Sequence, residues 1–375
     1  MKAILSLLIG VAIVTYTTHN MLEGAEPWAP KLLDVCFNPA NKDLLGKDRV
    51  VYTGIFSFLD RTICFFNNFS QSALHDILGA PFMRLMIGAF GTAYSLMAFE
   101  GSRRGFKTTL LIAYPIFGLL ANLFGVYAVF IVVWIPLSLY YREKSPKENN
   151  IWTITLPEAY GALLAIVLGY FVPGAVIASP LVEHNSRLEQ ELLAIWLVLP
   201  VILAPMIPFC GTIFKKLGSP VNNVADPILR ERLYAAEGKD ALERSYLFLG
   251  VTNMLLYFGT YLTIAHQGIR IWDSILMLLN APGSLPAGVP FEDLGKLLAT
   301  RTVLVDLIVL SIGFVLWAIF QSGFMVGMVV ALITPLVGPA AAVSFYAYYR
   351  EGTLENPTTT LDQAVKEAIA EGEKK

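Results

Sequence analysis

Long runs without charge are the feature of this sequence that most narrows its fold. Residues 106–141 form a run of 36 residues with a single charged side chain, Lys107. As one helix this run would be roughly 54 Å long, whereas the hydrocarbon core of a bilayer is about 30 Å thick. Hydrophobic residues make up 55% of the chain and charged residues only 15%. The sequence therefore predicts an all-α polytopic integral membrane bundle of about eight or nine transmembrane helices, with the lipid bilayer as its solvent.

Proline and glycine divide the longest runs. Residues 106–141 are expected to make two passes, because Pro115 and the stretch ending at Gly125 offer a place to turn. Residues 301–349 are long enough for two helices, broken near Gly323. The remaining spans are expected at residues 3–16, 82–99, 156–177, 192–214 and 246–266.

Four regions follow from this pattern. We expect a signal anchor at residues 1–19, an aromatic segment on the lumenal membrane surface at 20–81, the helical bundle at 82–349 and an acidic tail at 350–375. Cations gather around Arg103, around Arg142 and between Lys215 and Arg244, which the positive-inside rule places in the cytoplasm. The same count gives a cytoplasmic N-terminus and a last helix that ends in the lumen.

Several classes of function are excluded or disfavoured. The net charge of −2 leaves no electrostatic footprint for a nucleic acid. The three cysteines lack the paired spacings of metal sites, and no nucleotide-binding or hydrolase motif occurs, so we expect neither a metal nor a cofactor. Asn68 begins a glycosylation sequon. Cys36 and Cys64 are either a lumenal disulfide or two buried thiols.

Acidic residues in or near apolar segments are the candidates for catalysis. Asp306 lies about one and a half turns into an apolar helix; the alternative is an ion pair with Arg301 or an interhelical hydrogen bond. Glu158 begins a span, where helix capping is the competing explanation. Asp60 precedes Arg61 in an aromatic stretch and is either a lumenal proton donor or half of a surface salt bridge.

Polar and aromatic residues supply the candidates for substrate binding. Asn253, Tyr257 and Tyr261 recur at near-helical spacing, and the competing explanation is packing between helices. Trp196 lies near a span end, where tryptophans are typical of the membrane interface. If it faces inward, its ring can stabilise a carbocation. The pairs His75-Asp76 and Glu183-His184 fall on expected lumenal loops, and solvation is their default state.

Four features together carry a family resemblance: the short N-terminal anchor, the aromatic stretch at residues 59–68, the hairpin at 113–136 and the proline-flanked segment at 335–339. In these the chain resembles the fungal transmembrane terpene cyclases of meroterpenoid and indole-diterpene-type biosynthetic clusters. The resemblance implies a cofactor-free enzyme of the endoplasmic reticulum that protonates an alkene or epoxide of an isoprenoid substrate and that associates with other membrane-bound pathway enzymes. On this reading Asp306 or Asp60 is the proton donor and Glu158 a second carboxylate, while Tyr257, Tyr261 and Trp196 line the cavity.

Two other functions compete with this one. Pro200, Pro205 and Pro208 fall in one span, and helices broken by proline are common in transporters, so a transporter of a small apolar metabolite is the alternative. The absence of a convincing internal repeat counts against it. A non-catalytic membrane partner of a biosynthetic complex is the third hypothesis.

Overall fold

The computed structural model describes residues 1–25, 29–37, 51–144, 152–179, 181–184, 186–280 and 290–354. In these residues the regular structure is entirely helical. Seven of the described helices are long and apolar enough to cross a membrane by length and composition, and two shorter apolar helices accompany them at Leu110–Phe124 and Phe324–Val337. The prediction of an all-α polytopic bundle is confirmed.

The helices follow the apolar runs of the sequence. The first half of the chain forms α1 (Lys2–Ala25), α2 (Ala29–Phe37), α3 (Ser57–Leu74), α4 (Gly79–Ser102), α5 (Tyr114–Phe124), α6 (Val126–Ala128) and α7 (Ile135–Lys144). The second half forms α8 (Leu156–Ile166), α9 (Val172–Ile177), α10 (Arg187–Leu217), α11 (Pro227–His266), α12 (Ile271–Leu279), α13 (Phe291–Ser322), α14 (Phe324–Val337) and α15 (Pro339–Thr353). Two π-helical segments, Val129–Trp134 and Val167–Phe171, join α6 to α7 and α8 to α9.

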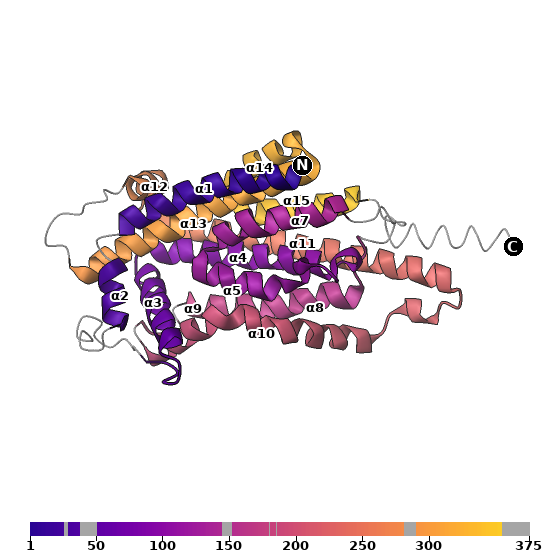
Figure 1. The fold of residues 1–375 in the computed structure, drawn as a ribbon, viewed down its shortest axis with the longest axis horizontal. Helices are drawn as coiled ribbons and strands as arrows, with labels where there is room; N and C mark the ends of the chain where they lie inside the picture. Colours follow the sequence, from indigo (N-terminus) through magenta and orange to yellow (C-terminus); the bar gives the residue numbers. More distant parts are fainter. Residues whose placement is uncertain are drawn as a thin grey trace.

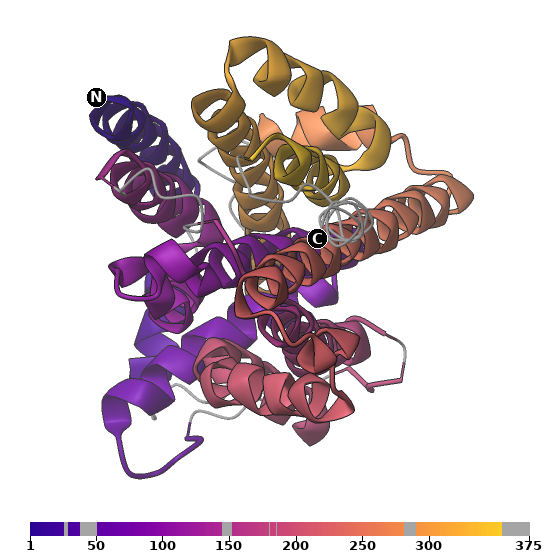
Figure 2. The ribbon, with the colours of Figure 1, turned by 90° about the vertical axis from the view of Figure 1, so that its right-hand side faces the viewer.

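The long helices run along the long axis of the molecule, with α4 in the middle (Figure 1). Nearly every residue of α4 is buried, and its glycines allow close approach: a Cβ on Gly91 would lie 2.5 Å from the ring of Phe171. The helix α1 lies at the edge of the bundle, beside α7 (Figure 2), and it also contacts α13. Its outward residues, such as Ile4 and Leu8, are exposed, as expected of a face that contacts lipid.

The two ends of the bundle differ in character. One end, called the arginine end below, holds Arg103, Arg142 and Arg350, all three within 6.0 Å of the ring of Trp152. The other, the disulfide end, carries α2 and α3 (Figure 1). The cationic loops that the sequence places in the cytoplasm therefore share one end.

The hairpin of residues 106–144 turns as predicted. Gly125 has a φ of +90°, a conformation that favours glycine, and it separates α5 from α6. Phe106 and Arg142 both contact the ring of Trp152, so the segment returns to the arginine end from which it started.

The last part of the chain reverses once more than expected. Residues 291–322 form the single helix α13, and breaks with positive φ follow at both Gly323 and Gly338. The second break sends α15 back to the arginine end, where Arg350 donates to Glu100 at 2.7 Å. Met1 lies at the same end, bonded to Glu143. The prediction that the last helix ends on the side opposite the N-terminus is therefore wrong, because Gly338 adds a reversal.

A buried cluster of four charges ties the arginine end together. Glu100, Arg103, Arg350 and Glu351 are each at most 4% exposed. Arg103 donates to Glu100 at 2.8 Å and also to Glu351, while Arg350 donates to both carboxylate oxygens of Glu100. The cluster joins the end of α4 to the end of α15, two helices about 250 residues apart in sequence. Its two positive and two negative charges cancel.

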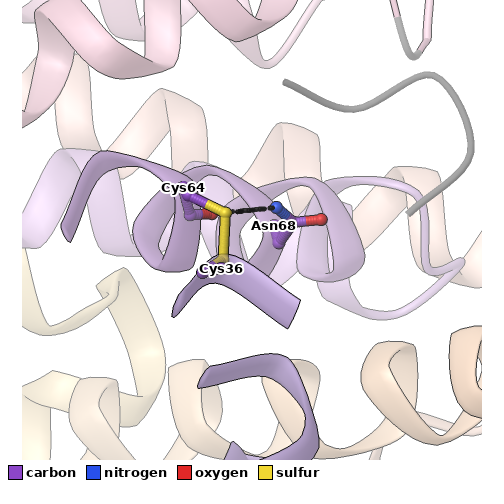
Figure 3. Close-up of a disulfide and its surroundings, with 3 residues drawn as sticks. All are labelled: Cys36, Cys64 and Asn68. Carbon is purple, nitrogen blue, oxygen red and sulfur yellow. Dashed lines mark hydrogen bonds between the residues drawn. A yellow bond between two sulfur atoms is a disulfide. The ribbon is translucent and has the colours of Figure 1, made fainter. Parts of the chain in front are cut away.

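The disulfide end is held by a covalent link. Cys36 of α2 and Cys64 of α3 form a disulfide (Figure 3). Around it Leu32, Val35, Leu294 and Leu298 make a small apolar cluster of their own. The two short helices are thereby fixed over the first turns of α13.

Candidate active site

Asp306 lies at the middle of α13, half-buried among apolar side chains. Its Oδ1 accepts a hydrogen bond from the backbone N–H of Tyr127, with an N–O distance of 3.2 Å. Tyr127 is in the first turn after Gly125, where backbone N–H groups have no partner within their own helix. Of the two structural alternatives, the interhelical hydrogen bond is present, whereas no ion pair with Arg301 occurs among the described residues.

Tyr170 brings a second polar group to this place. It is fully buried within the π-helical segment Val167–Phe171, and it lies close enough to Asp306 for the two groups to interact electrostatically. Its hydroxyl has no hydrogen-bond partner among the described residues. Buried polar atoms are rarely left unpaired, and π-helical segments are frequent at functional sites. An unpaired donor within electrostatic range of a carboxyl group is therefore a candidate position for a ligand oxygen.

Aromatic rings continue the site towards the disulfide end. The ring of Tyr170 lies 5.4 Å from that of Trp196 and 5.3 Å from that of Phe90. Phe66 of α3 stacks on Trp196 at 6.1 Å. Trp196 is buried in the packed core, and its Nε1 also lacks a partner among the described residues. These four rings, called the aromatic core below, present π-faces that attract cations.

An apolar cavity of about 370 Å³ lies between α1 and α13. Met21 and Tyr16 line it from α1, and Val305 and Val309 line it from α13. The hydroxyl of Tyr127 lies 3.0 Å from Thr18 Oγ1 and donates to Met21 Sδ at 3.5 Å. Tyr127 thus links Met21, which lines the cavity, to Asp306, which is not itself among the lining residues.

Glu158 has a structural role. Thr155 and Glu158 form a reciprocal capping box at the start of α8, and Glu158 also pairs with Lys107. The side chain lies at the arginine end and is not brought together with Asp306. The capping explanation accounts for its position.

Asp60 also serves the fold. Its carboxylate accepts backbone N–H groups from Tyr52, Thr53 and Gly54, which fixes this loop against α3. Burial alone raises the pKa of Asp60, but the hydrogen bonds from these N–H groups outweigh it and lower the pKa below its usual value. An ionised carboxylate does not suit the role of proton donor, so Asp60 is set aside as the catalytic acid.

Replacing Asp60 with asparagine tests this assignment. Because the pKa of Asp60 is depressed in the folded state, its contribution to stability is present above the unfolded pKa of about 3.9 and is lost as the pH falls through the folded value. We expect Asp60→Asn to lower the melting temperature by roughly 2–4 °C at pH 7, and the difference from wild type to shrink below about pH 4. A difference that does not depend on pH would contradict this account.

The polar stripe of α11 lies elsewhere. Asn253 donates to Thr92 Oγ1 at 3.0 Å and to Leu249 O, and Tyr257 donates to Pro335 O at 2.9 Å. Tyr261 is 53% exposed. Asn253 and Tyr257 join α11 to α4 and α14, and the structure brings none of the three residues together with Asp306. Packing between helices is thus the explanation that fits them.

The structure argues against a glycan on Asn68. Its side chain is buried within α3, and its amide donates to Cys64 O at 2.9 Å and to Cys64 Sγ beside the disulfide (Figure 3). A glycosylated amide has no room there, so the predicted modification does not fit the fold.

Tyr127 and Tyr170 are the residues that sequence reasoning missed. Each is a tyrosine in a long apolar run, and nothing in the local pattern distinguishes it from other buried tyrosines. The one available signal was Gly125, since a helix restarted inside a membrane leaves N–H groups that need a partner.

Comparison with known proteins identifies a family. A family model described as the CtvD domain matches residues 38–354, which is most of the chain. No curated protein matches, and no solved structure matches.

Proposed function

This chain belongs to the CtvD domain family, and we propose that it is a membrane-embedded enzyme that cyclises a prenyl or epoxidised prenyl chain by acid-initiated carbocation chemistry. The observation that carries the proposal is the position of Asp306 in the middle of a long apolar helix, one other face of which lines an apolar cavity. Ionisable residues at such depth are rare and mark functional sites.

The cavity, Asp306 and the aromatic core each have a separate role in the proposed reaction. The cavity between α1 and α13 holds the apolar chain, and Asp306 in its acid form transfers a proton to the substrate. The C–O bond of an epoxide breaks as its oxygen takes this proton, and the electron pair of a neighbouring alkene forms the new C–C bond. The aromatic core stabilises the resulting cation, and exclusion of water protects it. Loss of a proton from the last cation to the Asp306 carboxylate restores the enzyme, so the product is an isomer of the substrate.

The hydroxyl of Tyr170 favours an epoxide over an alkene as the group that is protonated. An alkene accepts no strong hydrogen bond, whereas an epoxide oxygen accepts one from Asp306 and a second from a neighbouring donor. Tyr170 is a buried donor without a partner among the described residues, and it interacts electrostatically with Asp306. On this proposal the Tyr170 hydroxyl donates a hydrogen bond to the epoxide oxygen of the prenyl chain.

Replacing Tyr170 with phenylalanine tests this choice. Removing one preorganised donor to a developing alkoxide typically lowers kcat by about 100-fold, and we expect Tyr170→Phe to slow epoxide cyclisation by about that factor. The measure is the initial rate of product formation per mole of folded enzyme. Tyr246→Phe is the matched control, because it also removes a buried hydroxyl that has no partner among the described residues, and Tyr246 packs against Phe99. Wild-type rates in Tyr170→Phe would mean that this hydroxyl does not hold the substrate oxygen.

The two ends of the bundle support a proposal for the location. We place the enzyme in the membrane of the endoplasmic reticulum, with the disulfide end in the lumen and the arginine end in the cytoplasm. Disulfides persist in oxidising compartments, and cationic loops stay in the cytoplasm.

The decisive experiment supplies membranes that contain the expressed protein with a prenylated aromatic compound and with its terminal epoxide. Liquid chromatography with mass spectrometry should reveal a new product of unchanged mass from the epoxide, absent in membranes without the protein. Uptake of the compound into sealed vesicles tests the transporter alternative. Accumulation of unchanged compound inside vesicles, with no isomer formed, would replace the cyclase with the transporter.

A further inference from the structure

Three metal-ligating side chains meet at the disulfide end, away from Asp306. They are His75 at the end of α3, His184 before α10 and Glu189 in the first turn of α10. Their ligand atoms all lie within 4.8 Å of one another. His75 Nε2 is 2.9 Å from Glu189 Oε1, and His184 Nδ1 is 3.7 Å from the same oxygen. The two imidazole rings are 4.2 Å apart between centroids.

The fold holds two of these three side chains, Glu189 and His75, in largely buried positions. Glu189 is only 1% exposed, and the side chain of His75 is 13% exposed. Gln71, one turn before His75 on α3, donates to Glu189 Oε2 at 2.9 Å, so that Oε1 faces the histidines. Hydrogen bonds of this kind, which orient a ligating carboxylate, are typical of metal sites.

A second observation points to a missing partner. The Gln71 side chain is 3% exposed, and its Oε1 has no hydrogen-bond partner among the described residues. Because its amide nitrogen is already committed to Glu189, a flip of the amide would place two oxygens against each other. Gln71 Oε1 can therefore still accept a hydrogen bond, and a water molecule bound to a metal ion would supply the donor.

We propose that His75, His184 and Glu189 bind a zinc ion, with water in the fourth position. Two imidazole nitrogens and one carboxylate oxygen are a ligand set that suits zinc, whereas calcium and magnesium prefer oxygen ligands alone. His184 is 69% exposed and provides the route by which the ion enters. The ion would join α3 to the start of α10, next to the aromatic core. This proposal does not depend on the chemistry at Asp306.

Metal content measured on the full-length chain tests the site. The protein is purified in detergent without a polyhistidine tag, incubated with zinc, dialysed and analysed by inductively coupled plasma mass spectrometry. We expect about one zinc per chain, and a lower melting temperature after treatment with a chelator. His184→Ala and Glu189→Gln should each reduce the zinc content at least tenfold. His184→Ala changes an exposed side chain, so the fold is retained.

The chain contains a matched control. His266, at the end of α11, is an exposed histidine outside the cluster, and His266→Ala should keep the wild-type zinc content. Wild-type protein that retains less than a tenth of a zinc per chain, with a melting temperature insensitive to chelator, would overturn the proposal. So would equal zinc loss in His266→Ala and His184→Ala, since that pattern indicates nonspecific binding by surface histidines.

Discussion

Replacing Asp306 with asparagine should reduce the rate of cyclisation by at least about 100-fold while leaving the amount of folded protein unchanged. Asparagine has nearly the shape of aspartic acid, and its Oδ1 still accepts the N–H of Tyr127, so the contact between α13 and the restarted helix is retained. The proton donor is lost. The rate is measured as product formed per mole of enzyme, and folding is measured as the melting temperature of the purified variant.

Two further variants separate chemistry from structure. Asp306→Glu keeps an acid but moves it by one methylene, so partial activity is expected. Ser311→Ala removes a polar group from the same helix, where the hydroxyl donates to Leu307 O of its own helix, and should leave the rate unchanged. Full activity in Asp306→Asn would remove Asp306 from the mechanism. A shared fall in Asp306→Asn and Ser311→Ala would point to a general sensitivity of α13.

The helical bundle was largely predictable because few backbone structures can cross a bilayer. Uncharged runs fix where the helices lie, and cationic loops fix which ends belong together. The break at Gly125 followed from a run too long for one pass. The break at Gly338 was missed because residues 324–353 are apolar enough for one helix, and a positive φ at glycine leaves no mark on hydropathy. Because of the extra reversal at Gly338, the last helix ends at the arginine end and not at the opposite end that was predicted.

The candidate site was predictable in part. Asp306 could be identified from the sequence because a carboxylate inside a transmembrane span is energetically unfavourable and is therefore typical of functional sites. Its neighbours could not be identified from the sequence. Tyr127, for example, is 179 residues away and contacts Asp306 because α13 packs against the hairpin. The roles of Glu158 and Asp60 depended on local hydrogen bonds. For Glu158 the spacing Thr155-x-x-Glu158 already indicated a capping box. For Asp60 no pattern showed that a preceding loop folds back onto its carboxylate.

Removing the carboxylate of Glu100 should destabilise the protein more than any surface substitution. Glu100→Ala leaves Arg103 and Arg350 buried without their shared partner, and breaking a buried ion pair from one side typically costs about 3–5 kcal/mol. The free energy of unfolding in detergent micelles gives the measurement. Arg104→Ala is the control, because Arg104 belongs to an exposed pair with Glu231 and its loss should cost about 1 kcal/mol or less.

A double variant shows whether charge balance is the cause. Arg350→Met combined with Glu100→Gln removes one charge of each sign and leaves Arg103 opposite Glu351, so the cluster stays neutral. We expect this variant to recover part of the stability lost in Glu100→Ala, because well-packed apolar or neutral groups replace buried charges with little penalty. If the double variant is less stable than Glu100→Ala, the cluster acts through the geometry of each hydrogen bond. Recovery indicates instead that charge neutrality is what lets the end of α15 pack against α4.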